Sequence, residues 1–280
     1  MSINKIALYL LTQHPKDAVR ALEQFEPEML AEYLDSIQVN TVADIMNFMV
    51  PSIAVDVLKN MTIEKSAKVV MQLGVERGAL LLQRMTGSIR FDFIRSMSPV
   101  FANMIRLVLR YPAGTVGQAM NPNVLTVQED LTVEEVLHVI KSSAEILHNE
   151  IYIINSKQHL VGQVSVRQLL ISTPEQKMKK IMVMPTYCLA ARSNVKSVKS
   201  IPDWQMREKF PVIDHHGVFI GVLDRAAINA SLRIYSKDQN GAESELTGTA
   251  LAVAELFWDA CADFIVPNQA ISNKGNKKNE

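Results

Sequence analysis

The sequence predicts a multidomain α+β protein. An N-terminal all-α superhelical solenoid of short 12-residue helical repeats precedes two related α/β units and a C-terminal helix. Three observations predict this organisation. Apolar residues recur at every twelfth position through the first third of the chain, two later segments repeat one order of strands and turns, and residues 246–266 carry apolar side chains at helical spacing.

The repeat is clearest in the register Leu22, Leu34, Met46, Leu58, Val70, Leu82 and Ile94. Within each unit the apolar residues fall at steps of three and four, which form one face of a short helix. Pro27, Pro51 and Pro99 fall where such helices would begin. A helix of about eight residues is not stable alone in water, so neighbouring units must stack over a shared core.

The outer face of these repeats is expected to be acidic. A solvated surface is one interpretation of the acidic residues, and contact with a metal ion is another; the spacing leaves both open. The residues concerned are Glu23, Glu26, Glu28, Glu32, Asp35, Asp44 and Asp56.

The composition excludes several classes of protein. Apolar residues make up 48% of the 280 residues, which suffices for a sizeable core and excludes global disorder. Lys plus Arg and Asp plus Glu number 29 each, so we expect no nucleic-acid partner. Cys188 and Cys261 make neither a disulfide scaffold nor a CxxC zinc site, which suits a cytoplasmic protein. Because we find no signal peptide and no sufficiently long apolar run, we expect no membrane insertion.

Two related α/β units are expected after the helical repeats. In the first unit, a capping box from Thr132 to Glu135 opens a helix. Ile153 and Gly162 reappear 59 residues later as Val212 and Gly221. The expected strands are 124–127, 151–154 and 160–164 in the first unit and 210–213 and 218–223 in the second.

Several segments of these units resemble the CBS motif: 118–122, 131–137 and 160–165 in the first, and 180–182, 210–214 and 220–223 in the second. A CBS pair preceded by repeated short helices resembles the intracellular part of MgtE-type magnesium transporters, without their transmembrane domain. We therefore expect an MgtE N-terminal-like helical domain at 1–112, CBS 1 at 113–174, CBS 2 at 175–240, a C-terminal amphipathic helix at 241–267 and a disordered tail at 268–280.

The resemblance implies a homodimer through the CBS pair, with Mg²⁺ bridging acidic residues. It also implies a ligand cleft between the CBS copies, at positions matching Gly162, Ser165, Gln168, Gly221 and Asp224. In the family's nucleotide pattern a hydroxyl contacts phosphate and an Asp holds the ribose. Gln168 replaces that Asp in the first copy, and Asp224 replaces the hydroxyl in the second. We therefore expect a degenerate cleft that does not bind adenine nucleotide.

The C-terminal segment offers metal candidates of its own. Glu255, Asp259 and Asp263 recur at every fourth position beside an apolar stripe. Like charges at this spacing repel one another, so they require solvent, basic partners or cations. These three residues are the candidate Mg²⁺ ligands.

No sequence motif of a nucleophile, an acid/base pair or a phosphate-binding loop is present, so we do not expect an enzyme. The leading hypothesis is a regulatory protein that senses Mg²⁺ or another small ligand, with a membrane transporter or another protein as partner. One alternative is the cytosolic fragment of a full magnesium transporter. A second alternative is a protein–protein adaptor, because similar short-helix domains occur in flagellar motor switch proteins.

Overall fold

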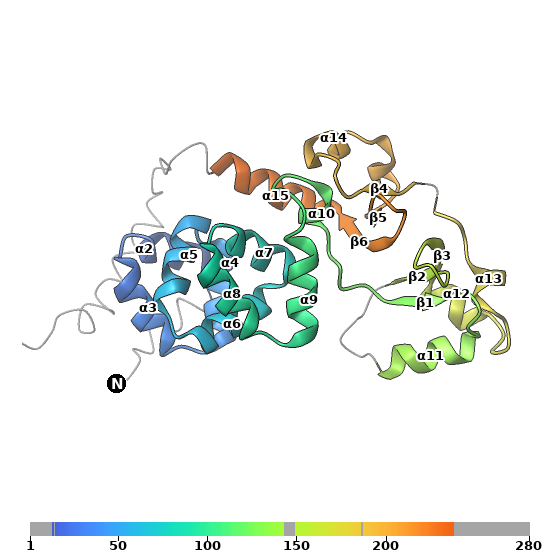
Figure 1. The fold of residues 1–280 in the computed structure, drawn as a ribbon, viewed down its shortest axis with the longest axis horizontal. Helices are drawn as coiled ribbons and strands as arrows, with labels where there is room; N and C mark the ends of the chain where they lie inside the picture. Colours follow the sequence, from blue (N-terminus) through green and yellow to red (C-terminus); the bar gives the residue numbers. More distant parts are fainter. Residues whose placement is uncertain (1–12, 14, 143–148, 186, 238–280) are drawn as a thin grey trace, which may run out of the picture. The chain divides into compact units, whose positions relative to one another are not determined.

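The computed structural model describes residues 13, 15–142, 149–185 and 187–237. They form two compact units on either side of the boundary between Lys65 and Ser66. Helices fill the chain as far as Val108, and two small sheets with short helices follow (Figure 1). The expected α+β organisation is confirmed in this part of the chain. The helix expected at 241–267 and the tail at 268–280 lie outside the described residues, and the domain bounds remain predictions.

The helical repeats begin where the 12-residue spacing places them. Pro27, Pro51 and Pro99 each occupy the first position of a helix, where the missing N–H costs no hydrogen bond. The helices are α2 (Pro15–Leu22), α3 (Pro27–Asp35), α4 (Val39–Phe48), α5 (Pro51–Asn60), α6 (Ile63–Leu73), α7 (Val75–Gln83), α8 (Gly87–Arg95) and α9 (Pro99–Val108).

Alternate helices of the repeat pack on one another. In the first compact unit α2 packs on α4 and α3 on α5, and in the second unit α7 packs on α9. The 12-residue apolar register supplies the core of each unit, because Leu34, Met46, Leu58, Val70 and Leu82 are all fully buried. The periodicity therefore identified core positions correctly.

Acidic side chains also connect the repeats of the first unit. The Glu23 carboxylate accepts a hydrogen bond from the backbone N–H of Val50 at 2.6 Å, and Asp35 accepts one from Thr62 at 3.1 Å. Val50 and Thr62 immediately precede α5 and α6, where negative charge is favourable. Two residues of the expected acidic face thus bind the starts of later helices.

A basic side chain stabilises the C-terminal end of α3. The Lys65 ammonium donates to the backbone carbonyl of Leu34 at 3.0 Å and also to the carbonyls of Asp35 and Ile37. Positive charge at a helix C-terminus satisfies carbonyls that have no partner within the helix. Burial lowers the pKa of Lys65, and the Asp35 carboxylate opposes this shift.

The two sheets have the same topology and the same register. Each pairs its first strand with the second in parallel, and its second with the third antiparallel. Ile153 lies opposite Gly162, and Val212 lies opposite Gly221, as the 59-residue offset requires. The strands are β1 (Thr126–Gln128), β2 (Glu150–Ile154) and β3 (Leu160–Ser165) in the first copy, and β4 (Leu189–Ala190), β5 (Lys209–Ile213) and β6 (Phe219–Asp224) in the second.

Short helices accompany both sheets. Thr132 and Glu135 form the expected capping box before α11, because the Thr132 N–H donates to the Glu135 carboxylate at 2.8 Å and the Glu135 N–H donates to Thr132 Oγ1 at 3.3 Å. The helices are α10 (Val116–Ala119), α11 (Val133–Ser142), α12 (Val166–Ile171), α13 (Met178–Ile181), α14 (Val195–Lys199), the 3₁₀ helix η1 (Pro202–Gln205) and α15 (Arg225–Lys237).

Each copy adds its leading segment to the sheet of the other copy. Asn121, which precedes β1, exchanges two backbone hydrogen bonds with Val222 of β6, at 2.7 and 2.9 Å. Val183, which precedes β4, exchanges two with Gln163 of β3, both at 2.9 Å. We call residues 114–121 and 176–183 the lead-in segments. Their exchange joins the two copies into one folded body.

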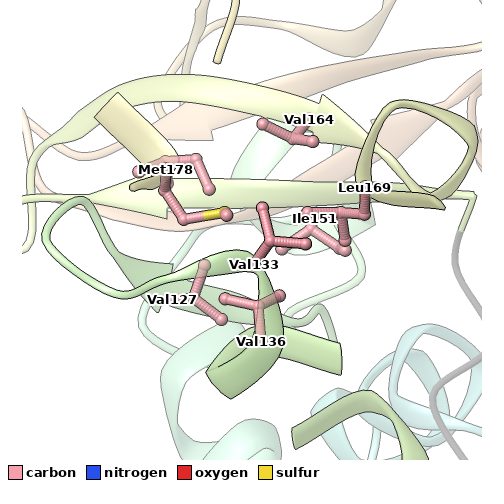
Figure 2. Close-up of a cluster of buried hydrophobic side chains, with 8 residues drawn as sticks. Val127, Val133, Val136, Ile151, Val164, Leu169 and Met178 are labelled. Atoms are coloured by element: carbon pink, nitrogen blue, oxygen red, sulfur yellow. The ribbon is translucent and has the colours of Figure 1, made fainter. Parts of the chain in front are cut away.

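The core of the first copy contains a residue of the second lead-in segment. Figure 2 shows Met178 of α13 among Val127, Val133, Ile151 and Val164 of the first copy. Met178 is fully buried there. The second lead-in segment therefore contributes both hydrogen bonds and apolar packing to the first copy.

All five expected strands lie within two residues of their expected bounds, and two of them start later than expected. The strand expected at 124–127 is observed at Thr126–Gln128, because the Val124 N–H turns back to the carbonyl of Pro122 at 3.0 Å. The strand expected from residue 218 begins at Phe219, because the Val218 N–H binds the Asp214 carboxylate in the preceding turn at 2.9 Å. Local hydrogen bonds thus set both starts.

The cap between repeats can be tested with Glu23→Ala. This change removes the acceptor for Val50, so we expect the free energy of unfolding in urea to fall by about 1 kcal/mol. Glu26→Ala is the matched control, because Glu26 is exposed and makes no side-chain cap of α3. An equal loss in the two variants would contradict the role of Glu23.

Candidate functional site

The two glycines of the expected cleft lie where the lead-in segments cross the sheets. A Cβ atom at Gly162 would lie 2.6 Å from the Met182 sulfur, and one at Gly221 would lie 2.6 Å from the carbonyl oxygen of Asn121. Both separations are too short for a side chain. Both glycines therefore serve the exchange between copies, independently of any ligand.

Ser165 and Asp224 occupy equivalent positions, each at the end of the last strand of its copy. Ser165 Oγ accepts the N–H of Gln168 at 3.1 Å, and the Asp224 carboxylate accepts the N–H of Ala227 at 2.7 Å. Each side chain therefore starts the helix that follows it. A structural role explains why an acceptor stands at both positions; their ligand-binding role remains a prediction.

Glu76 is a further candidate that the sequence analysis missed. It lies in the first turn of α7, within the same compact unit as the two α/β copies. Burial raises the pKa of Glu76 to about 7, the nearby Asp224 charge contributes to this rise, and Lys209 acts in the opposite direction. The sequence does set Glu76 apart, because residues 66–110 contain seven Lys or Arg and only two acidic residues, Glu76 and Asp92.

Glu76 and Asp224 bring two negative charges together from distant parts of the chain. Lys209 lies opposite Asp224 in the β5–β6 pairing, and its positive charge lowers the pKa of Glu76. Two carboxylates suit Mg²⁺, which is usually held by one or two of them and retains several waters. No cluster of three or more His, Cys, Asp or Glu side chains occurs among the residues that the structure describes.

The three acids expected to bind a metal in the C-terminal segment are Glu255, Asp259 and Asp263. All three lie outside the described residues, so that assignment remains a prediction. The chemistry of the described residues therefore points to Glu76 with Asp224.

The raised pKa of Glu76 predicts a dependence of stability on pH. The folded protein holds this proton more tightly than the unfolded chain, so the stability it contributes is complete below about pH 4.5 and is lost as the pH rises through about 7. Glu76→Gln should therefore stabilise the protein against urea by about 2 to 3 kcal/mol at pH 8 and by much less at pH 5.

Glu64→Gln is the control for this prediction, because Glu64 also lies in the first turn of a helix but is exposed. We expect the control to change stability little at either pH. The same gain for Glu76→Gln at pH 5 and at pH 8 would show that charge at this position is not the cause.

The chain matches two family models, the MgtE intracellular N domain at residues 13–114 and the CBS domain at residues 116–173. The magnesium transporter MgtE of Bacillus subtilis is 23% identical over 211 residues, which are 75% of this chain and 47% of the transporter. The magnesium transporter MgtE of Thermus thermophilus is 26% identical over 122 residues, which are 42% of this chain and 27% of that protein. The chain thus spans about half the length, or less, of these relatives.

Two solved structures share the fold. The cytosolic domain of the Mg²⁺ channel MgtE in complex with ATP has a TM-score of 0.53 and 20% identity, over 76% of this chain and 92% of that one. The soluble part of a magnesium transporter has a TM-score of 0.57 and 16% identity, over 84% and 97%. Because the first structure holds ATP, the comparison does not support our expectation that adenine nucleotide is not bound.

The matched residues end at position 173, and the second α/β unit continues the pattern beyond them. It repeats the strand order and register of the first copy and completes the exchange of lead-in segments. Within residues 13–237, the described helices include none that is long and apolar enough to cross a membrane. Together these findings identify the chain as a relative of the cytosolic region of MgtE magnesium transporters, with an MgtE intracellular N domain followed by a CBS domain.

Proposed function

We propose that this chain is a non-catalytic regulatory module in which Mg²⁺ controls the contact between α7 of the helical domain and the second CBS copy. One observation carries the proposal: the carboxylate of Glu76, a partly buried residue whose pKa desolvation raises, also interacts with the charge of Asp224. The two residues lie on elements that are separated by almost 150 positions of sequence. Any cation between them would therefore act on how those elements pack.

The physical basis is relief of electrostatic repulsion. Two ionised carboxylates in a partly buried place repel each other strongly, since little water screens them. Lys209 offsets part of this repulsion. A bound Mg²⁺ would supply the remaining positive charge through Glu76 and Asp224 and complete its coordination with water. Loss of the cation would leave the repulsion between Glu76 of α7 and Asp224 at the start of α15 unrelieved.

The similarity to MgtE relatives supports this proposal at the level of the family. The named relatives are magnesium transporters, and the named solved structures are the cytosolic or soluble parts of such proteins. We propose a cytoplasmic protein whose partner is a membrane transporter or another protein. The partial coverage of the relatives also supports the alternative that this chain acts as the cytosolic part of a full magnesium transporter.

The proposal is tested by thermal unfolding of EDTA-treated protein at pH 8 with increasing MgCl₂. A ligand that binds only the folded state at about ten times its Kd adds about 1.4 kcal/mol of stability, which corresponds to a rise in Tm of a few degrees. Glu76→Gln should raise Tm without Mg²⁺ and remove most of the Mg²⁺ response. Asp224→Asn should behave similarly, because Asn still caps α15.

Glu64→Gln should retain the full response to Mg²⁺. If Glu76→Gln and Asp224→Asn also retain it, the cation binds elsewhere and this site is wrong.

The same titration with ATP present tests adenine nucleotide as a second candidate ligand, which the ATP-bound similar structure favours. Stabilisation by ATP that survives Glu76→Gln would place the nucleotide at a separate site.

We also propose that the protein dimerises through its CBS region. Leu170 and Ile171 of α12 are 68% and 71% exposed, an apolar surface that would be buried by a partner. The equivalent positions of α15 in the second copy are the smaller or polar Asn229 and Ala230. This difference favours a dimer contact centred on the first copy.

Sedimentation of the 31.3 kDa chain checks this proposal. We expect a dimer at micromolar concentration, and a monomer after Leu170→Glu with Ile171→Glu. Asn229→Glu with Ala230→Glu is the matched control and should leave the dimer unchanged. A monomer of the unmodified protein at micromolar concentration would refute the proposed dimer.

A further inference from the structure

The helical domain is divided into two halves of opposite charge. Residues 13–65 contain nine Asp or Glu and four Lys or Arg, whereas residues 66–110 contain two Asp or Glu and seven Lys or Arg. The formal charges of the halves are therefore equal and opposite, and the zero net charge of the whole chain conceals this division. Such separation of charge favours association of two chains, because the acidic half of one chain can contact the basic half of the other.

The basic half contains an open groove between α8 and α9, with a volume of about 430 Å³. We call it the arginine groove; its lining residues are Gly87, Arg90, Phe91, Ile94, Arg106, Leu109 and Arg110. Arg106 and Arg110 are exposed, and Phe91 is 64% exposed. An apolar floor with guanidinium groups beside it suits an amphipathic helix that carries carboxylates. Arginine and aromatic residues are also the types that dominate the energy of protein interfaces.

The acidic half offers a helix of that kind. On α3 the side chains of Glu28 and Glu32 are exposed one turn apart, and Met29 beside them is 42% exposed. We call these three residues the α3 surface. The opposite face of α3 is held in the core by Leu30 and Leu34, so the helix presents this surface in a fixed form.

We propose that the α3 surface of one copy docks in the arginine groove of a second copy. Glu28 and Glu32 would pair with Arg106 and Arg110, and Met29 would cover the exposed ring of Phe91. The same surfaces occur on every copy, so the occupant need not be sought outside this chain. Because the ion pairs lie at an exposed surface, the contact is weak and depends on salt. This contact does not involve the CBS copies or the Mg²⁺ site.

The test uses charge reversal on the full chain. One variant carries Glu28→Lys and Glu32→Lys, and a second carries Arg106→Glu and Arg110→Glu. Self-association is followed by sedimentation of a fluorescently labelled chain titrated with the same unlabelled chain at about 50 mM and about 500 mM NaCl, which differ several-fold in screening length. We expect the unmodified protein to associate at least roughly tenfold more tightly at the lower salt concentration. Each variant alone should lose this salt-dependent step.

A mixture of the two variants gives the decisive result. Each reversed surface meets its reversed partner on the other variant, so mixing should restore the association to within a fewfold of the unmodified protein. Dimerisation through the CBS pair is common to all these chains and cancels in the comparison. Matched controls with the same change of charge at exposed positions outside both surfaces are Asp44→Lys with Glu64→Lys, and Lys68→Glu with Arg95→Glu.

The controls should associate like the unmodified protein. Loss of the salt-dependent step in the controls, or its absence from the mixture, would overturn the proposal and leave only a general effect of charge. Absence of any salt-dependent step in the unmodified protein at concentrations up to about 100 micromolar would also overturn it, and would make the arginine groove a surface for a different acidic protein.

Discussion

The exchange of lead-in segments is the constraint on which the rest of the α/β region depends. Asn121 completes the second sheet and Val183 completes the first, so neither copy has a full sheet without the other. The buried Met178 adds apolar packing to the same exchange. A Cβ atom would meet the Met182 side chain at position 162 and the Asn121 backbone at position 221, which explains why glycine stands at both positions. The exchanged segments therefore link the two copies within one compact unit.

Asp224 lies in this α/β region, at the end of β6, and its charge acts on Glu76 in α7 of the helical domain. Asp224 caps α15 and at the same time contributes to the raised pKa of Glu76 on α7, whose main cause is burial. Asp224 thus has a structural role at the start of α15 and also makes the ionisation of Glu76 on α7 less favourable. Repulsion between these two carboxylates is a candidate for regulation, because a cation or a proton can remove it without unfolding the protein.

The helical domain uses charge in three ways. Glu23 and Asp35 bind helix starts, and Lys65 binds a helix end, so these charges stabilise the stacking of repeats. Glu76 is partly buried and interacts with the charge of Asp224, which makes it a candidate for regulation. Other charges remain on the surface, where their separation into an acidic and a basic half favours association. One acidic outer face, as the sequence suggested, therefore contains residues with different functions.

The sequence by itself determined the 12-residue repeats, the proline starts of the helices and the 59-residue offset between the copies, because each depends on spacing along the chain. It also placed the capping box at Thr132 and Glu135, since capping is local. Only the tertiary structure decided that the Asp224 charge acts on Glu76, and that Gly162 and Gly221 leave room for Met182 and Asn121 of the lead-in segments. These relations join residues far apart in sequence, and a pattern of local spacing carries no record of which distant segments fold against each other.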